Sequence, residues 1–123
     1  MSHRLIPLTV TVRWSHGEAT AALRGDLDHD SAAAAIQRLG EILERRPARL
    51  VVDLSGVSLP EASRPMEVIR VIISARQAAL PVDIPVVLRS PSPAILKVIR
   101  VSGLDQVCAV ENDVRPARRP SEL

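Results

Sequence analysis

Two short aliphatic runs constrain the fold of this chain more than any other feature of its sequence. Residues 49–54 (RLVVDL) and 84–88 (IPVVL) are nearly continuous apolar segments of strand length. Such runs are typical of strands that are covered on both faces. Each is followed by a segment with helical spacing of apolar residues, so the sequence predicts an α/β fold with residues 49–54 as a central strand.

The other elements follow from hydrophobic patterning and from turn and cap residues. Residues 15–17 (SHG) supply turn chemistry between two alternating segments, and Ser92, Pro93 and Gly103 are placed to cap, open and end a helix. The predicted elements are strands at 8–13 and 18–24, a helix ending near Arg46, a strand at 49–54, a helix at about 65–79, a strand at 84–88, a helix at 93–102 and a strand at 106–110. This β-β-α-β-α-β-α-β order predicts a mixed sheet of about four to five strands with crossover helices.

The composition favours one soluble globular domain. The chain has 123 residues, of which 46% are hydrophobic and 24% charged, and this length leaves no room for two ordinary domains. We expect a domain at 1–110 and a flexible polar tail at 111–123, which carries Arg115, Arg118 and Arg119. Trp14 is the only aromatic residue and the net charge is +2, so direct nucleic-acid binding by base stacking is not predicted.

Cysteine content and hydropathy indicate a cytoplasmic protein. Cys108 is the single cysteine, so no intramolecular disulfide can form, and we expect it to be a small buried residue of the last strand. No segment approaches the ~20 consecutive apolar residues that a membrane-spanning helix needs. The first residues, MSHRLIPLTV, contain no long apolar stretch of the kind found in targeting peptides. Membrane insertion is therefore not predicted.

The loop at residues 25–31 (GDLDHDS) holds the densest group of acidic side chains. Asp26, Asp28 and Asp30 have the spacing that begins a calcium loop, but the positions that require Gly and Glu hold Ser31 and Gln37. We therefore interpret Asp30 or Ser31 as the cap of the following helix, with Asp26 and Asp28 facing water.

Residue chemistry predicts no active site. The histidines, His3, His16 and His29, lack zinc-binding spacing, and a pairing of Cys108 with His29 has no supporting motif. None of the five glycines lies in a phosphate-binding pattern. We expect no enzyme activity, no metal and no cofactor.

Three segments together resemble one known family. Residues 25–32 (GDLDHDSA) and 51–63 (VVDLSGVSLPEAS) are similar to the two signature loops of the STAS domain family, as found in anti-sigma factor antagonists. Residues 90–107 are similar to the closing helix and strand of that family, and the resemblance covers residues 8–110. It implies a sheet with helices on one side. It also implies partner switching, in which an unphosphorylated antagonist binds an anti-sigma factor that is also a serine kinase.

The resemblance also identifies where regulation would act. The phosphoacceptor of the family lies in a D-S-S-G-L or D-S-T-G-L pattern, which aligns here with Glu61, Ala62, Ser63, Arg64 and Pro65. Ala62 therefore stands where the usual acceptor serine would be, and alanine cannot be phosphorylated. A phosphate there would add about −1.5 to −2 charges at a helix N-terminus. The usual phospho-switch is accordingly predicted to be missing.

Ser63 has two interpretations. It caps the helix, with Arg64 and Pro65 in the first turn, or it is a displaced phosphoacceptor. The predicted partner is an anti-sigma factor or a related serine kinase, and a homodimer is also considered. The predicted partner-binding residues are Asp28, Ser58, Glu61, Ala62, Ser63, Arg64 and Glu67.

Two other functions stay open. In one, the same fold serves as a scaffold or accessory subunit of a larger assembly. The resemblance implies this alternative because STAS domains are also found in stress-sensing complexes and as accessory subunits of lipid transporters. In the other, Arg64 and the N-terminus of its helix hold an anion. Arg64 is the one cationic side chain that supports this interpretation.

Overall fold

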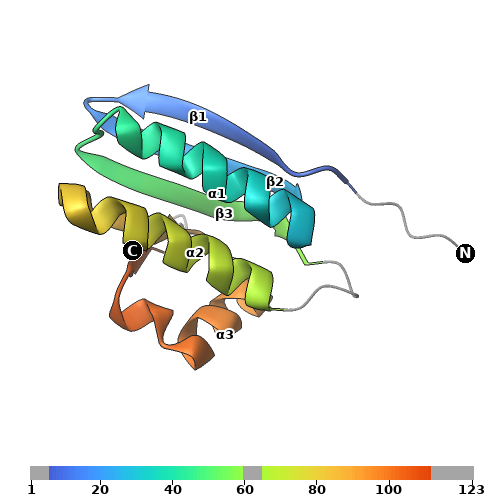
Figure 1. The fold of residues 1–123 in the computed structure, drawn as a ribbon. Helices are drawn as coiled ribbons and strands as arrows, with labels where there is room; N and C mark the ends of the chain where they lie inside the picture. The colour runs from blue at the N-terminus through green and yellow to red at the C-terminus, as the bar shows by residue number, and fades with distance from the viewer. Residues whose placement is uncertain (1–5, 60–64, 112–123) are drawn as a thin grey trace, which may run out of the picture.

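A mixed sheet organises the molecule (Figure 1). The computed structural model describes residues 6–59 and 65–111, and its five strands lie in the order β1-β2-β3-β4-β5. β1 and β2 are antiparallel, whereas β2, β3, β4 and β5 pair in parallel. The predicted mixed α/β sheet is therefore confirmed, with β3 at its centre. The strands are β1 (Thr9–Ser15), β2 (Glu18–Asp26), β3 (Arg49–Ser58), β4 (Val86–Arg89) and β5 (Ala109–Glu111).

A tight turn joins β1 to β2. Ser15 pairs with Glu18, so only His16 and Gly17 lie between the strands. Both have positive φ, 52° and 80°, as a two-residue hairpin turn requires. The predicted hairpin is confirmed, although Ser15 belongs to the strand rather than to the turn.

Three helices among the described residues, α1 (His29–Glu44), α2 (Met66–Ala79) and α3 (Pro93–Ser102), cover one face of the sheet (Figure 1). Single turns of 3₁₀-helix at Leu80–Val82 and Leu104–Gln106 follow α2 and α3. The predicted placement of helices on one side is confirmed. Alternate strand residues point to the helices and form the core, namely Ala19, Ala21, Leu23, Leu50, Val52, Leu54, Val86 and Leu88.

Among the described residues, the opposite face of the sheet carries a network of ion pairs. Val51 and Val87 lie on this face, opposite each other in register, and are only 0% and 5% exposed. Beside them Arg49 donates to Glu18 at 2.6 Å and lies 3.6 Å from Glu111, which in turn accepts from Arg89 at 3.1 Å. The aliphatic stems of the two arginines can cover apolar surface while their guanidinium groups stay hydrated. The nearly continuous apolar run at 49–54 thus reflects burial on both faces.

The residues at both ends of α3 cap the helix as predicted. The Ser92 hydroxyl accepts from Ile95 N at 3.3 Å, Pro93 opens the helix, and Gly103 ends it with φ of 82°. By contrast α1 ends at Glu44, two residues before the predicted Arg46, because Arg46 has a φ of 55° that no α-helix accommodates.

The bounds of all five strands differ from the prediction, those of β3 and β5 most of all. β3 continues from residue 54 to Ser58, because its last residues pair with Arg24 to Asp26 of β2 beyond a bulge. The last strand begins at Ala109, and Cys108 lies buried just before it. Glu111, where the flexible tail was expected to begin, is the final residue of β5, and residues 112–123 lie outside the described residues.

Candidate functional site

The carboxyl ends of two parallel strands bring separate sequence segments together. Asp26 at the end of β2 is in register with Ser58 at the end of β3, and Leu27 N donates to Ser58 O at 2.9 Å. Asp28 follows directly and opens α1. Two predicted site residues, Asp28 and Ser58, therefore lie at the same end of the sheet, where α/β proteins commonly bind ligands and partners.

A reciprocal cap starts α1 at this end. Asp28 Oδ1 accepts from Ser31 N at 2.9 Å, while Ser31 Oγ accepts from Asp28 N, also at 2.9 Å. The prediction that Asp30 or Ser31 is the N-cap is wrong, because β2 runs on to Asp26 and places Asp28 at the cap. The backbone N–H and hydroxyl of Ser31 lower the pKa of Asp28 below its ordinary value.

Asp26 does not face water as predicted. It is 7% exposed, its Oδ2 accepts from Ile6 N at 2.7 Å, and its own N–H donates to Ile6 O at 2.9 Å. Gly25 allows this approach: it has φ of 119°, and a Cβ there would lie 2.4 Å from Pro7 O. The chain before β1 is thereby held against the loop that leads into α1.

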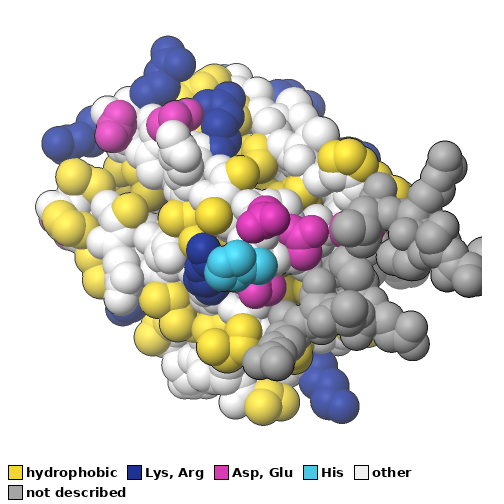
Figure 2. All heavy atoms as spheres, turned by 45° about the vertical axis from the view of Figure 1, so that its right-hand side comes forward, with side chains coloured by type: hydrophobic (Ala, Val, Ile, Leu, Met, Phe, Trp, Pro, Cys, Tyr) yellow, Lys and Arg dark blue, Asp and Glu magenta, His cyan; other side chains and the backbone are white. Residues whose placement is uncertain are grey.

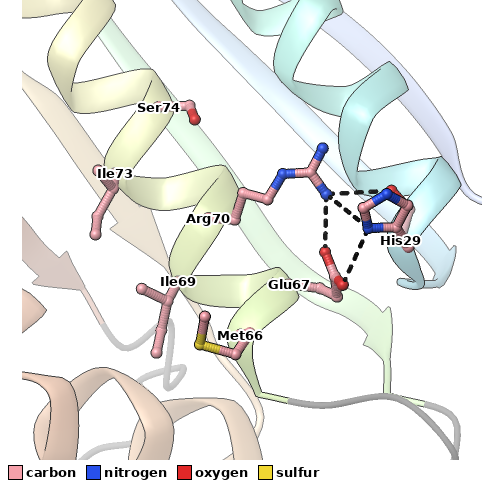
Figure 3. Close-up of a pocket in the computed structure, with 7 residues that line it drawn as sticks. All are labelled: His29, Met66, Glu67, Ile69, Arg70, Ile73 and Ser74. Carbon is pink, nitrogen blue, oxygen red and sulfur yellow. Dashed lines mark hydrogen bonds and ion pairs between the residues drawn. The ribbon is translucent and has the colours of Figure 1, made fainter.

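Charged side chains join the start of α1 to the first turns of α2 (Figure 3). Arg70 Nη1 donates to Glu67 Oε1 at 3.0 Å and to the carbonyl oxygen of His29 at 3.3 Å. His29 Nδ1 lies 3.6 Å from Glu67 Oε2, and the Glu67 side chain is only 16% exposed. Glu67, a predicted partner-binding residue, therefore lies beside the start of α1, close to Asp28. We call His29, Glu67 and Arg70 the charged cluster.

His29 was not predicted as a partner-binding residue, and Arg70 was predicted only as the end of a binding segment that begins at Glu61. They are 41 positions apart in the chain, and nothing in their local sequence pairs them. The spacing of Glu67 and Arg70 by three residues on a helix is a signal that could have identified the ion pair.

Apolar side chains next to the charged cluster remain exposed. The helical spacing of Met66, Ile69 and Ile73 predicts that they share one broad apolar face, yet Met66 is 62% exposed and Ile73 is 38% exposed. The buried residues of α2 are Val68, Val71, Ile72, Ala75 and Ala79. With the charged cluster, Met66, Ile69, Ile73 and Ser74 line a surface groove of about 490 Å³. Figure 2 shows hydrophobic side chains beside the histidine, acidic and basic groups on this face.

A second groove adjoins the first and shares Ile69. It lies between α2 and α3 and has a volume of about 460 Å³. Val101 is 80% exposed at its rim. The lining is apolar except for Ser102 and Lys97 and consists of Pro65, Ile69, Lys97, Val98, Val101 and Ser102.

The remaining predicted site residues lie outside the described residues. These are Glu61, Ala62, Ser63 and Arg64, together with the interpretation of Ser63 as a cap or phosphoacceptor. α2 begins at Met66 with Pro65 at its N-cap, so the described helix starts later than the predicted cap at Ser63.

The described residues also bear on metal binding and on membrane insertion. No group of three potential metal ligands occurs within residues 6–59 and 65–111. In the same part of the chain, no helix is long and apolar enough to cross a membrane.

Burial raises the pKa of the Cys108 thiol, which keeps it in the less nucleophilic protonated form.

The fold and the site define a small α/β domain that presents a helix-borne, partly apolar surface at the carboxyl end of its sheet. A family model described as "Mlab, STAS domain" matches residues 10–111, which is most of the chain. The chain therefore belongs to the STAS domain family, and the resemblance found in the sequence is confirmed.

The individual proteins to which this chain is similar include anti-sigma factor antagonists. Anti-sigma-F factor antagonist RsfB of Mycobacterium tuberculosis is 40% identical over 50 residues, which are 41% of this chain and 41% of that protein. The aligned part is thus less than half of the curated relative. The crystal structure of an anti-sigma factor antagonist from Mycobacterium paratuberculosis has 21% identity and a TM-score of 0.68, with 85% of each chain covered.

A third similarity is to a chain in the architecture of the stressosome, a signal integration and transduction hub. The identity is 21%, the TM-score is 0.59, and the match covers 85% of this chain and 89% of the other. At this level of identity, the two structural matches establish the fold.

Proposed function

We propose that this STAS domain is a non-enzymatic, cytoplasmic regulator of the anti-sigma factor antagonist type. Its partner is an anti-sigma factor or a related serine kinase, and it needs no cofactor. One observation carries the proposal: Asp28, Ser58 and Glu67 come from three segments of the chain and lie at the same end of the sheet. The similarity to anti-sigma factor antagonists supports the type of partner.

The surface chemistry favours a protein as the ligand. Met66, Ile69 and Ile73 offer apolar area, and Glu67 and Arg70 offer an ion pair that is already oriented by His29. An apolar patch bordered by charged groups is typical of a protein–protein interface, whose centre excludes water while its rim provides specificity. Glu61 and Arg64 would extend this surface from the segment that precedes α2 in the sequence.

The proposed domain lacks the usual phospho-switch. Ala62 occupies the aligned acceptor position, so the domain would remain competent to bind its partner or would respond to a different signal. Ser63 is the alternative acceptor. Incubation with the cognate kinase and Mg-ATP, followed by intact-mass measurement and peptide mapping, separates these versions, because only a displaced switch adds phosphate to Ser63.

A binding titration tests the proposed surface. We expect the anti-sigma factor kinase from the same source to bind the purified domain, and Met66→Glu to weaken binding about tenfold or more by placing a charge in an apolar contact. Leu80→Glu is the matched control, since Leu80 is also exposed, 54% against 62% for Met66, but follows the far end of α2. Absence of binding by the wild-type domain, or equal losses in both variants, would contradict the proposal.

A second candidate is a scaffold or accessory subunit of a larger assembly. The similarity in fold to a stressosome chain favours this alternative. Identification of the proteins that copurify from the native cell distinguishes the two candidates. An anti-sigma factor or a related serine kinase supports the first, whereas subunits of a stress-sensing complex, or a transporter ATPase and permease, support the second. Neighbouring genes provide the same distinction independently.

A further inference from the structure

The two edges of the sheet are protected to very different degrees. β5 is three residues long, and its Glu111 is paired with Arg89 and Arg49. β1 is seven residues long with the sequence TVTVRWS, which contains one charge and no proline. Short length, charges and proline are the usual means by which proteins prevent pairing at a sheet edge. Of the two edges, β1 is therefore the one open to another strand.

The backbone of β1 has hydrogen-bonding groups available on its outer side. β1 is an edge strand, and among the residues described no strand pairs with this side. In a hairpin closed by a two-residue turn, the residues flanking the turn form a hydrogen-bonded pair. Ser15 and Glu18 flank the turn, so Ser15, Arg13, Thr11 and Thr9 bond to β2. The N–H and C=O groups of Val10, Val12 and Trp14 consequently face outward.

The same three residues expose apolar side chains. Val10, Val12 and Trp14 are in register with Leu23, Ala21 and Ala19, so they lie on the helix-covered face of the sheet. Val10 and Val12 pack against the core but remain partly exposed, and Trp14 is 44% exposed. Arg45, the C-cap residue of α1, lies over the Trp14 ring, 5.5 Å from its centroid. The open edge therefore combines free backbone groups with an apolar strip.

We propose that β1 pairs with β1 of a second copy of this chain, antiparallel, about a two-fold axis at Val12. This register places Val12 opposite Val12 and Val10 opposite Trp14. The outward-facing N–H and C=O groups of one β1 strand therefore lie opposite those of the other and can form hydrogen bonds. The exposed face of Trp14 then packs on Val10 of the second copy. Arg13 lies opposite Thr11, so no like charges stand directly opposite each other. The strand is thus complementary to itself in backbone and in side chains.

The dimer leaves the proposed partner-binding surface accessible. β1 is the sheet edge farthest from α2 and α3 (Figure 1), and the charged cluster lies on α2 and at the start of α1. Two five-stranded sheets would join into one, with a helix-borne surface on each copy. Such a dimer presents two equivalent sites and would bind a dimeric partner with avidity.

Sedimentation or light scattering of the full chain, from micromolar to about millimolar concentration, tests the proposal. We expect a monomer–dimer equilibrium. Val12→Lys should raise the dimer dissociation constant about tenfold or more, because two like charges would face each other across the axis. Val110→Lys is the matched control, since Val110 is also a partly buried valine packed on the core but lies on β5. A wild-type monomer throughout, or equal effects of both substitutions, would overturn the proposal.

Two further measurements keep the test decisive if Val12→Lys does not fold. Trp14 is the only tryptophan, so its emission should shift to shorter wavelength, and its quenching by acrylamide should fall, as the dimer forms. Mixed chains carrying Thr11→Cys and Arg13→Cys should form a disulfide between copies under mild oxidation. In the proposed register these positions form a non-hydrogen-bonded pair with Cα atoms about 4.5 Å apart. Equal cross-linking of either variant with itself would contradict the register, and concentration-independent emission would contradict burial of Trp14.

Discussion

Asp28 and Ser31 cap each other's backbone at the start of α1, with both hydrogen bonds at 2.9 Å. This reciprocal contact fixes the first turn of α1, which holds His29 against Glu67 and Arg70 of α2. Ser31 also donates from its hydroxyl to Asp26 O at 3.1 Å, so the cap is linked to the end of β2. The geometry of the proposed surface therefore depends on one short polar loop.

The Asp28 carboxylate makes the cap sensitive to pH. Its pKa is lowered in the folded protein from the ordinary value of 3.8, chiefly by the N–H of Ser31. Because the folded pKa is the lower one, the contribution to stability is complete above the unfolded pKa and is lost as pH falls through the folded pKa. We expect Asp28→Asn, which keeps the cap acceptor without titrating, to flatten the dependence of the urea midpoint on pH between about 2 and 6.

Asp28→Ala should lower the urea midpoint near neutral pH more than Asp28→Asn does, because alanine cannot accept the hydrogen bond from Ser31. Urea unfolding followed by circular dichroism measures both effects. Parallel pH profiles for wild type and Asp28→Asn would show that Asp28 does not carry the acid dependence.

Gly25 permits the close approach of the N-terminal segment to the same loop. Gly25→Ala should destabilise the domain by about 1–3 kcal/mol, because the φ of 119° is disfavoured for alanine and its Cβ would meet Pro7 O. Gly40→Ala is the control. Gly40 lies within α1 with open space around its Cβ position, so this substitution should stabilise by about 0.5–1 kcal/mol. Thermal and urea unfolding of both variants measure the difference. Equal effects would contradict the steric role of Gly25.

Two arginines on helices provide a comparison of an exposed and a partly buried ion pair. Arg70 pairs with Glu67 at 3.0 Å, and Arg38 pairs with Glu41 at 3.5 Å, both with i, i+3 spacing. The Glu67 side chain is 16% exposed, whereas that of Glu41 is 54% exposed. Arg70→Ala should cost about 1–3 kcal/mol by leaving a largely buried carboxylate poorly paired, and Arg38→Ala about 0–1 kcal/mol.

Urea unfolding of the Arg70→Ala and Arg38→Ala variants measures these costs. Adding Glu67→Gln to Arg70→Ala should recover part of the loss, because the unpaired charge is then removed. If the double substitution is no more stable than Arg70→Ala alone, the cost comes from lost packing of the Arg70 stem instead.

Hydrophobic patterning predicted the three α-helices of the described residues and the order of the elements, although not the 3₁₀ turns, because periods of 2 and 3.6 residues reflect one-sided burial directly. It predicted boundaries less well where pairing in the fold overrides local sequence. The segment LSGVS at the end of β3 contains serine and glycine, which locally favour a loop, yet its pairing with the end of β2 makes it a strand.

The candidate site shows the same division between local and long-range information. Several aspartates in GDLDHDS are acceptable caps, and only the observed end of β2 selects Asp28 among them. The apolar face of α2 is wider than the core it covers, so patterning alone could not reveal that Met66 and Ile73 remain exposed. The contact of His29 with Glu67 joins two elements brought together only by folding.

Restoring a hydroxyl at position 62 tests the interpretation of the missing switch. Wild-type protein should gain no phosphate from the cognate kinase, because Ala62 stands at the aligned acceptor position. Ala62→Ser should gain about one phosphate per chain, and the phosphate should weaken partner binding about tenfold or more, equivalent to ~1.4 kcal/mol. The double variant Ala62→Ser/Ser63→Ala controls for the adjacent serine and should behave like Ala62→Ser. Intact mass, peptide mapping and calorimetric titration provide the measurements. Phosphorylation of wild-type protein on Ser63 would show instead that the switch is displaced by one residue.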